Sequence, residues 1–142
     1  MPDEEAVRAS FARQGALRFL GAEMESVGDG RCVLRLPFRD ELSQQHGSFH
    51  AGVLATLADS AGGYAAFSLM PEGSEVLATE FKFNFLRPAD GDVAVAEAQV
   101  VKSGRTLTVS RLDVFVGRGG ERVHVATGLQ TCICLPQAPL EE

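Results

Sequence analysis

The residues best suited to chemistry lie in one segment, Gln44-Gln45-His46-Gly47-Ser48-Phe49-His50-Ala51-Gly52, and in a single carboxylate that follows it, Asp59. The segment runs into a helix-like stretch over residues 53–70. It combines polar side chains, glycines and a helix start, where free N–H groups and the positive end of the helix dipole favour negative charge. Acyl-transfer sites are commonly built from these parts.

The helix predicted over residues 51–70 has two unlike faces. One face follows helical spacing and should pack on a sheet: Leu54, Leu57, Ala58, Ala61, Ala65 and Leu69. Apart from Asp59, the other face carries only small residues: Gly52, Ala55, Thr56, Gly62, Gly63 and Ala66. A glycine inside a helix costs about 1 kcal/mol relative to alanine, and solvent-facing helices usually carry Lys, Glu or Gln. We therefore expect a partner backbone or a ligand to approach this face closely.

Asp59 is the single charge on that small-residue face. The local pattern alone fits a satisfied buried aspartate as well as a catalytic one, and the polar loop before the helix favours the catalytic interpretation. Asp59 lies seven residues after Gly52, which separates the two by about 10 Å along the helix axis. A carbonyl held at the helix start is out of reach of the same chain's Asp59. The carboxylate would have to come from a second subunit packed antiparallel along the small-residue face of the helix, so we expect a two-fold dimer with composite sites.

At these residues the chain resembles the phenylacetate-degradation (PaaI-like) type of hotdog-fold acyl-CoA thioesterases. The signature of that family is Asn-x-x-Gly-x-x-His-Gly-Gly followed by a helix with Leu-x-Asp. Here it reads Gln44-x-x-Gly47-x-x-His50-Ala51-Gly52, then Leu57-Ala58-Asp59. The segments Phe85-Leu86-Arg87-Pro88-Ala89 and Lys102-Ser103-Gly104-Arg105 are similar to the family's F-L-R-P-A and K-x-G-R. The resemblance covers roughly residues 20–135, and the combined spacing is specific.

The resemblance implies hydrolysis of an acyl-CoA thioester to a free acid and coenzyme A. Asp59 would be the catalytic carboxylate, as nucleophile or as general base. The backbone N–H of Ala51 would polarise the thioester carbonyl, a contribution typically worth a few kcal/mol of barrier. Gln44 would form a hydrogen bond with the attacking water or with the thioester carbonyl. His50 would orient the loop, and a histidine that caps its own helix start is an equal and compatible interpretation.

Coenzyme A would enter as part of the substrate, so the resemblance implies no separate cofactor. Arg87, Lys102 and Arg105 are the best candidates for contacts with its phosphates, and the turn Ser103-Gly104 could present N–H groups beside them. Gly52 and Thr79 complete the expected substrate-binding set. For Lys102 and Arg105 taken singly, an ordinary solvated turn residue is the simpler explanation.

Three positions depart from the family's pattern. Gln44 replaces the asparagine and is one methylene longer, and Ala51 replaces a glycine and adds a methyl group beside the reacting carbon. The family often places a serine on the strand after the helix. That register holds Ala78 here, and Thr79 would face the other side of a regular strand. The hydroxyl that would position water, and the choice between nucleophile and base, stay open.

The remaining elements read as scaffold. Residues 3–20 predict a short amphipathic helix with a break near Gly15, and residues 22–27 and 31–38 predict a β-hairpin. Period-two patterns predict strands over residues 76–86, 92–102, 106–116 and 122–135, with a phase shift near Arg111 that indicates a bulge. We expect one α+β domain over residues 1–142, a curved antiparallel sheet with the long helix on one face. Its core spans about 20–135, with an N-terminal helix at about 3–19 and a frayed tail at 136–142. With the resemblance, this architecture is the hotdog fold.

Composition limits the functional classes. The 142 residues are 45% hydrophobic with a formal net charge of −6, which disfavours nucleic acid or an anionic membrane surface as partner. The chain has no run of about twenty apolar residues, and its acidic start is unlike a signal peptide. Cys32, Cys132 and Cys134 lack metal-ligand spacing and read as buried free thiols. We expect a cytoplasmic protein without a metal.

Two other functions stay open. An acyl-thioester hydratase or dehydratase needs a histidine paired with a carboxylate, which His50 and Asp59 could imitate. A non-catalytic acyl-CoA-binding protein gains nothing from a buried charge such as Asp59. Tyr64, Phe67 and Phe49 could line an aryl or medium-chain pocket, although aromatic residues at helical spacing are more often core. The expected assembly is a homodimer as the minimum unit, with a homotetramer favoured. His46 and His124 are given no role.

Overall fold

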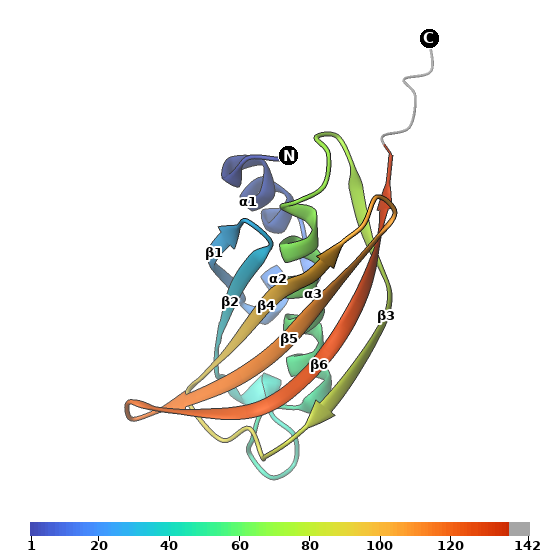
Figure 1. Cartoon of the computed structure of the whole chain (residues 1–142). Helices are drawn as coiled ribbons and strands as arrows, with labels where there is room; N and C mark the ends of the chain where they lie inside the picture. The colour runs from blue at the N-terminus through green and yellow to red at the C-terminus, as the bar shows by residue number, and fades with distance from the viewer. Residues whose placement is uncertain (137–142) are drawn as a thin grey trace.

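The computed structural model describes residues 1–136, in which six antiparallel strands curve around one long helix (Figure 1). The elements run in the order α1 (Glu4–Ala12), α2 (Gly15–Leu20), β1 (Glu23–Gly28), β2 (Arg31–Pro37), the 3-10 helix η1 (Asp40–Leu42), α3 (Ala51–Phe67), β3 (Glu75–Phe85), β4 (Val93–Ser103), β5 (Leu107–Arg118) and β6 (Glu121–Leu135). The strand order in the sheet is β1-β2-β4-β5-β6-β3. The predicted α+β architecture is confirmed.

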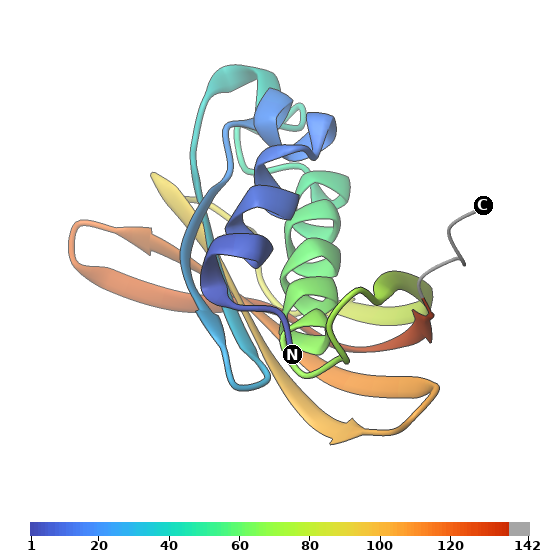
Figure 2. The same cartoon turned by 90° about the horizontal axis from the view of Figure 1, so that it is seen from above.

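The N-terminal helix is broken in two, as expected, and lies beside α3 and the edge strand β1 (Figure 2). Arg13 and Gln14 separate α1 from α2. Val7 and Leu17 enter the core, and Gln14 donates a hydrogen bond to the hydroxyl of Tyr64 on α3 at 2.9 Å. The tail expected to fray lies outside the described residues from position 137 onward.

The helix α3 buries most of its surface. Leu54, Leu57, Ala61 and Ala65 pack into the core as the spacing predicts. The small-residue face differs from its prediction, because Gly62 and Ala66 are also buried against the chain's own sheet. The part of that face left uncovered holds Gly52, Ala55, Thr56, Asp59 and Gly63. The helix also ends at Phe67, three residues before the expected Met70.

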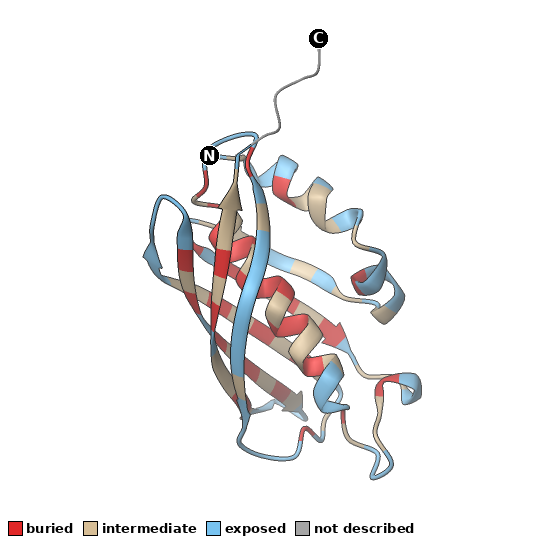
Figure 3. Ribbon diagram, turned by 90° about the vertical axis from the view of Figure 1, so that its right-hand side faces the viewer, coloured by how far each residue is buried: buried red, intermediate tan, exposed pale blue. Residues whose placement is uncertain are grey.

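The strand β3 forms one edge of the sheet and is exposed along most of its length (Figure 3). It pairs only with β6, so its other edge presents unpaired backbone groups. Phe81 and Phe85 on this strand are 45% and 48% exposed. A long edge strand with exposed phenylalanines is the sort of surface that another chain covers.

The bulge predicted near Arg111 is wrong. Along β5 the buried positions alternate without interruption through Thr108, Ser110, Leu112, Val114 and Val116. The sequence pattern changes phase because the inward positions Thr108 and Ser110 are polar. The irregularities in register skip a residue on other strands, between Met24 and Ser26 on β1, Ala78 and Glu80 on β3, Val100 and Lys102 on β4, and Ala126 and His124 on β6.

Candidate active site

The loop before α3 is fixed by its own backbone. Gln44 N–H donates to Ser48 O at 2.9 Å, and Gly47 N–H donates to Gln44 O at 3.0 Å. Gly47 turns the chain with φ +86°, a left-handed conformation that favours glycine. Phe49 then anchors the loop to the segment after β3, because its N–H donates to Ala89 O at 3.0 Å. The loop therefore holds the start of α3 at a defined place.

His50 caps α3. Its Nδ1 accepts from the N–H of Gly52 at 2.9 Å, and its carbonyl accepts from Val53 and Leu54. The geometry therefore supports the interpretation of His50 as a helix cap. An Nδ1 that accepts this hydrogen bond cannot itself carry a proton. Among the described residues, the N–H of Ala51 has no acceptor and lies at the positive end of the helix dipole.

A cleft of about 440 Å³ opens at this helix start, and we call it the helix-start cleft. Its lining combines the loop, the helix start and the segment after β3: Gln44, Ser48, Phe49, Ala51, Leu54, Phe85, Leu86, Arg87, Pro88 and Ala89. Arg87 donates one hydrogen bond to His124 O at 2.9 Å, which holds its guanidinium beside the cleft. The structure therefore brings Gln44, Ala51 and Arg87 together.

Asp59 lies in a different cleft of about 380 Å³, the Asp59 cleft. Its lining comes from α1, α3 and β3 and the residues next to them: Ser10, Arg13, Gln14, Asp59, Ser60, Gly63, Tyr64, Glu75, Val76, Leu77 and Ala78. Asp59 is half-buried, and this burial raises the pKa of its carboxyl above the ordinary aspartate value, while a hydrogen bond from Gln130 acts in the opposite direction. A carboxylate in such surroundings is poorly solvated and correspondingly basic.

The two clefts share no residue among those the structure describes. On β3 they use opposite ends, Glu75–Ala78 for the Asp59 cleft and Phe85 for the helix-start cleft. The structure therefore keeps Asp59 and Ala51 of one chain apart, in agreement with the axial gap expected from the sequence.

Thr79 lies outside both clefts. The pairing of β3 with β6 skips Thr79, between Ala78 and Glu80, and the Thr79 hydroxyl donates to Thr131 O at 3.1 Å. Ala78 instead lines the Asp59 cleft. The structure thus gives no support to a substrate contact from Thr79, because its hydroxyl is engaged by the backbone of β6.

The turn Lys102-Ser103-Gly104-Arg105 is exposed at the end of β4. The N–H of Gly104 is engaged with Leu107 O at 2.8 Å, so it is not free to contact a phosphate. The turn lies at the end of the sheet where β3 begins, since Leu107 and Leu77 both pair with Ile133. Arg87 follows the other end of β3, so the length of the strand, roughly 33 Å at 3.3 Å per residue, separates these basic groups within one chain.

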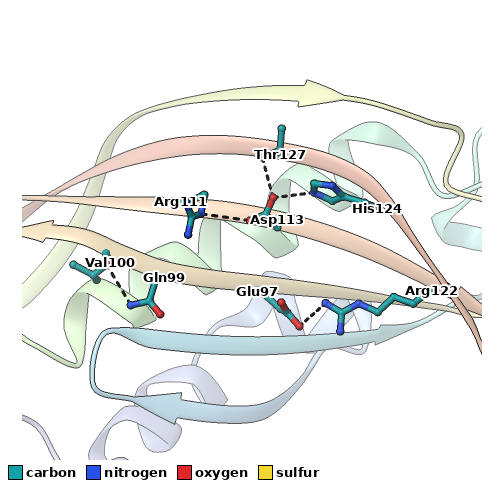
Figure 4. Close-up of polar contacts among 8 residues, drawn as sticks. All are labelled: Glu97, Gln99, Val100, Arg111, Asp113, Arg122, His124 and Thr127. Atoms are coloured by element: carbon teal, nitrogen blue, oxygen red, sulfur yellow. Dashed lines mark hydrogen bonds and ion pairs between the residues drawn. The ribbon is translucent and has the colours of Figure 1, made fainter.

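The His50–Asp59 pair needed for a hydratase does not form within the chain, because the two residues lie in different regions. His124 instead pairs with Asp113, Nε2 to Oδ1 at 2.8 Å, on the outer face of the sheet (Figure 4). Thr127 donates to the same carboxylate oxygen at 2.9 Å. His124 and Asp113 line neither cleft.

Sequence reasoning missed several residues around Asp59. Ser10, Arg13 and Gln14 reach the Asp59 cleft from the N-terminal helical segment, and no spacing rule links them to α3. Gln130 is 1% exposed beneath α3. Its signal was present in the sequence, because Gln130 shares the inward phase of β6 with Cys132. Of the aromatic residues considered for a pocket, Tyr64 lines the Asp59 cleft and Phe49 the helix-start cleft.

Within residues 1–136, no cluster of three His, Cys, Asp or Glu side chains could hold a metal ion. No helix in that range is long and apolar enough to cross a membrane. Cys32 and Cys132 are buried free thiols as expected, whereas Cys134 is half-buried.

Known proteins resemble this chain in family, sequence and fold. Residues 46–123 match the thioesterase superfamily. A crystal structure of a thioesterase family protein from Silicibacter pomeroyi superposes with a TM-score of 0.90 at 48% identity, over 92% of this chain and 96% of that one. A putative esterase from Halobacterium salinarum is 36% identical over 77% of this chain and 84% of its own length. The acyl-coenzyme A thioesterase PaaI from Escherichia coli is 30% identical over 75% of this chain and 74% of its own.

These matches agree with the architecture. The family match runs from the helix-start loop through Asp59 into β6, and the S. pomeroyi structure shares the fold over nearly the whole chain. The resemblance seen in the sequence is confirmed. The chain belongs to the thioesterase superfamily, has the hotdog fold, and is a PaaI-like member of that family.

Proposed function

We propose that this protein hydrolyses acyl-CoA thioesters to a free acid and coenzyme A. The observation that carries the proposal is a half-buried carboxylate of raised pKa, Asp59, together with a helix-start N–H that has no acceptor among the described residues, that of Ala51. The family and the E. coli relative named as an acyl-coenzyme A thioesterase support the substrate class.

In the proposed reaction the thioester carbonyl oxygen accepts a hydrogen bond from the Ala51 N–H. The helix dipole adds to this stabilisation as negative charge develops on that oxygen. Asp59 either removes a proton from the attacking water, or attacks the carbonyl carbon itself to form an anhydride that a water molecule later hydrolyses to the free acid and the restored carboxylate. The C–S bond then breaks, and coenzyme A leaves as the thiol after taking up a proton. Gln44, at the rim of the helix-start cleft, contacts the water or the carbonyl.

The active site is proposed to form between two copies of the chain. If two β3 edges pair antiparallel about a two-fold axis, the start of one strand lies beside the end of the other. That arrangement brings the Asp59 cleft of one chain next to the helix-start cleft of its partner, because the clefts use opposite ends of β3. The exposed edge of β3 and its phenylalanines support this pairing.

The function is tested by thiol release from a panel of aryl, short-chain and long-chain acyl-CoAs. Wild type should turn over at least one class, and Asp59→Asn should lose at least a hundredfold in kcat. The substitution keeps the shape and an acceptor for Gln130, so folding and ligand binding should stay intact. Near wild-type hydrolysis by this variant would contradict the mechanism, and no turnover of any thioester by wild type would contradict the function.

The shared site is tested by complementation. Asp59→Asn is mixed with Ala51→Pro, which removes the proposed donor at a helix position that tolerates proline. Each variant alone should be inactive. After unfolding and refolding together, about half of the dimers are mixed and each contains one intact site, so activity should return to up to a quarter of wild type. A mixture that stays inactive although heterodimers form rules out this arrangement.

A further inference from the structure

The amide of Gln130 lies beneath α3, buried between the helix and the sheet. It is 1% exposed, and its Nε2 donates to two atoms of Asp59, the backbone oxygen at 2.8 Å and the carboxylate Oδ1 at 2.7 Å. One side chain from β6 therefore holds both the main chain and the reactive group of Asp59. A hydrogen bond to an ionised carboxylate is short and strong compared with one between neutral groups.

Asp59 fixes which way the amide points, because its backbone oxygen and its carboxylate Oδ1 are acceptors that require the NH2 group, and Cys132 fits that orientation. Its Sγ donates to Gln130 Oε1 at 3.3 Å. Burial, with the charge of Asp59 as a smaller cause, raises the pKa of the Cys132 thiol to about 11, so the thiol keeps its proton at neutral pH and can act only as donor toward Oε1. With Oε1 facing the thiol, the NH2 group faces Asp59.

Gly62 provides the room that the amide occupies. A Cβ at position 62 would lie 2.1 Å from Gln130 Oε1 and 2.7 Å from a methyl carbon of Leu112. Glycine is a poor helix former, so this position is explained by the contact with Gln130 rather than by a partner chain. Gly63, by contrast, faces open space, because a Cβ added there would meet no atom of the described residues within 4 Å.

Gln130 belongs to a row of buried polar residues on the inner face of the sheet, with Thr108, Ser110 and Cys132. Ser110 lies directly across from Gln130 on β5. Its hydroxyl has no hydrogen-bond partner among the described residues. The Gln130 amide thus forms hydrogen bonds with Asp59 and Cys132, whereas the neighbouring Ser110 hydroxyl forms none with the described residues.

We propose that Gln130 is the positioning residue of the thioesterase site, holding the Asp59 carboxylate in its working orientation through a Cys132–Gln130–Asp59 chain for which Gly62 leaves room. The inference rests on the proposed function, since it assigns Asp59 the chemical role. Gln130 does not line either cleft, so it acts through Asp59 and not on the substrate.

The first test is Gln130→Met, which keeps the length of the side chain and removes the donor. We expect kcat to fall about ten- to a hundredfold with KM changed less than twofold. The charged and titratable groups that share the cleft with Asp59, Arg13 after α1, Tyr64 on α3 and Glu75 on β3, stay in place. Loss of the donor disfavours the carboxylate, so the acid limb of the kcat/KM profile should move to higher pH. Ser110→Ala is the matched control and should keep wild-type kinetics.

Gly62→Ala is an independent way to break the hydrogen bond between Gln130 and Asp59. It leaves Gln130 in the chain, favours the helix, and forces the amide away from its present place. The same fall in kcat and the same shift of the acid limb are expected. If Gln130→Met fails to fold, this variant decides the question. Wild-type kcat and an unmoved acid limb in the folded variants would overturn the proposal, as would an effect on KM alone.

A double variant separates positioning from a general structural role. Because Gln130 acts through Asp59, adding Gln130→Met to Asp59→Asn should cost no further activity, and a further tenfold loss would overturn the proposal. The pKa of Asp59, followed by carboxyl 13C NMR in labelled protein, should rise in Gln130→Met. This titration needs no turnover, so it tests Gln130 even if the thioesterase function fails, whereas an inactive wild type with a shifted Asp59 would overturn only the function.

Discussion

The two clefts differ in how they are built. The helix-start cleft draws most of its polar groups from one continuous segment that ends at Ala51, and its proposed donor to the substrate is a backbone N–H. The Asp59 cleft draws its lining from α1, α3 and β3, and β6 adds the contact from Gln130. A backbone donor needs only a correct local turn, whereas a reactive carboxylate needs burial and a positioned donor, which only distant elements can supply.

The largest effect is expected when both clefts are kept intact but the two chains are separated. Phe81 lies midway between the β3 residues of the two clefts and is 45% exposed. Phe81→Glu would place the introduced carboxylates of two chains close together at the two-fold axis of the proposed dimer. We expect a monomer by analytical ultracentrifugation, with at least a hundredfold loss of kcat/KM.

The matched control for Phe81→Glu is Leu129→Glu. Leu129 is 54% exposed and belongs to β6, away from the free edge of the sheet. This variant should keep both the dimer and the activity. An active Phe81→Glu monomer would contradict the shared site, because each cleft would then suffice without the other chain.

The turn at the end of β4 is predicted to bind the phosphates of the coenzyme. Lys102→Ala combined with Arg105→Ala should raise KM for acyl-CoA about tenfold at low salt, because the prediction assigns these two cations to the coenzyme phosphates. A truncated pantetheine thioester should be affected little. Arg31→Ala, an exposed arginine outside both clefts, is the control. Equal effects on both substrates would place Lys102 and Arg105 away from the phosphates.

The helix-start cleft is predicted to depend on the cap of α3. His50→Ala removes the acceptor for the Gly52 N–H and should lower the free energy of unfolding by about 1 kcal/mol, with a several-fold loss of kcat as the Ala51 donor loses its fixed position. His50→Asn retains a capping side chain and should recover most of both losses. Equal defects in the two variants, measured by denaturant unfolding and steady-state kinetics, would give His50 a role other than capping.

The ionised carboxylate of Asp59, which the proposed reaction needs, is predicted to lower the stability of the fold. Burial raises the pKa of Asp59, so the folded chain binds the carboxyl proton more tightly than the unfolded chain. The free energy of unfolding therefore falls as the pH rises from the pKa of Asp59 in the unfolded chain to its higher pKa in the folded chain. Asp59→Asn should therefore have a slightly higher Tm than wild type at neutral pH. The difference should disappear below the ordinary aspartate pKa. A lower Tm for Asp59→Asn at neutral pH would show that the carboxylate stabilises the fold.

The local features of the molecule could be predicted from the amino-acid sequence alone. The order of elements, the loop that ends at the cap of α3, and the separation of about 10 Å between Asp59 and the helix start all follow from spacing within a short window, because helix and strand periodicity repeat every few residues. The family signature over the same residues added the hotdog fold and the chemistry. These expectations needed no knowledge of which strands pair.

The tertiary structure decided what surrounds Asp59. The burial of Gly62 against Gln130, the inward polar positions Thr108 and Ser110, and the approach of Gln14 to the Asp59 cleft join segments far apart in sequence. Strand order and helix docking set these contacts, and no local period encodes them. Two predictions from the sequence were wrong. The helix pattern attributed Gly62 to the close approach of a partner or ligand. The strand pattern attributed the polar inward residues Thr108 and Ser110 to a bulge near Arg111. Gly62 is explained by Gln130, a side chain from a strand far away in the sequence, whereas Thr108 and Ser110 keep the inward phase of β5 although they are polar.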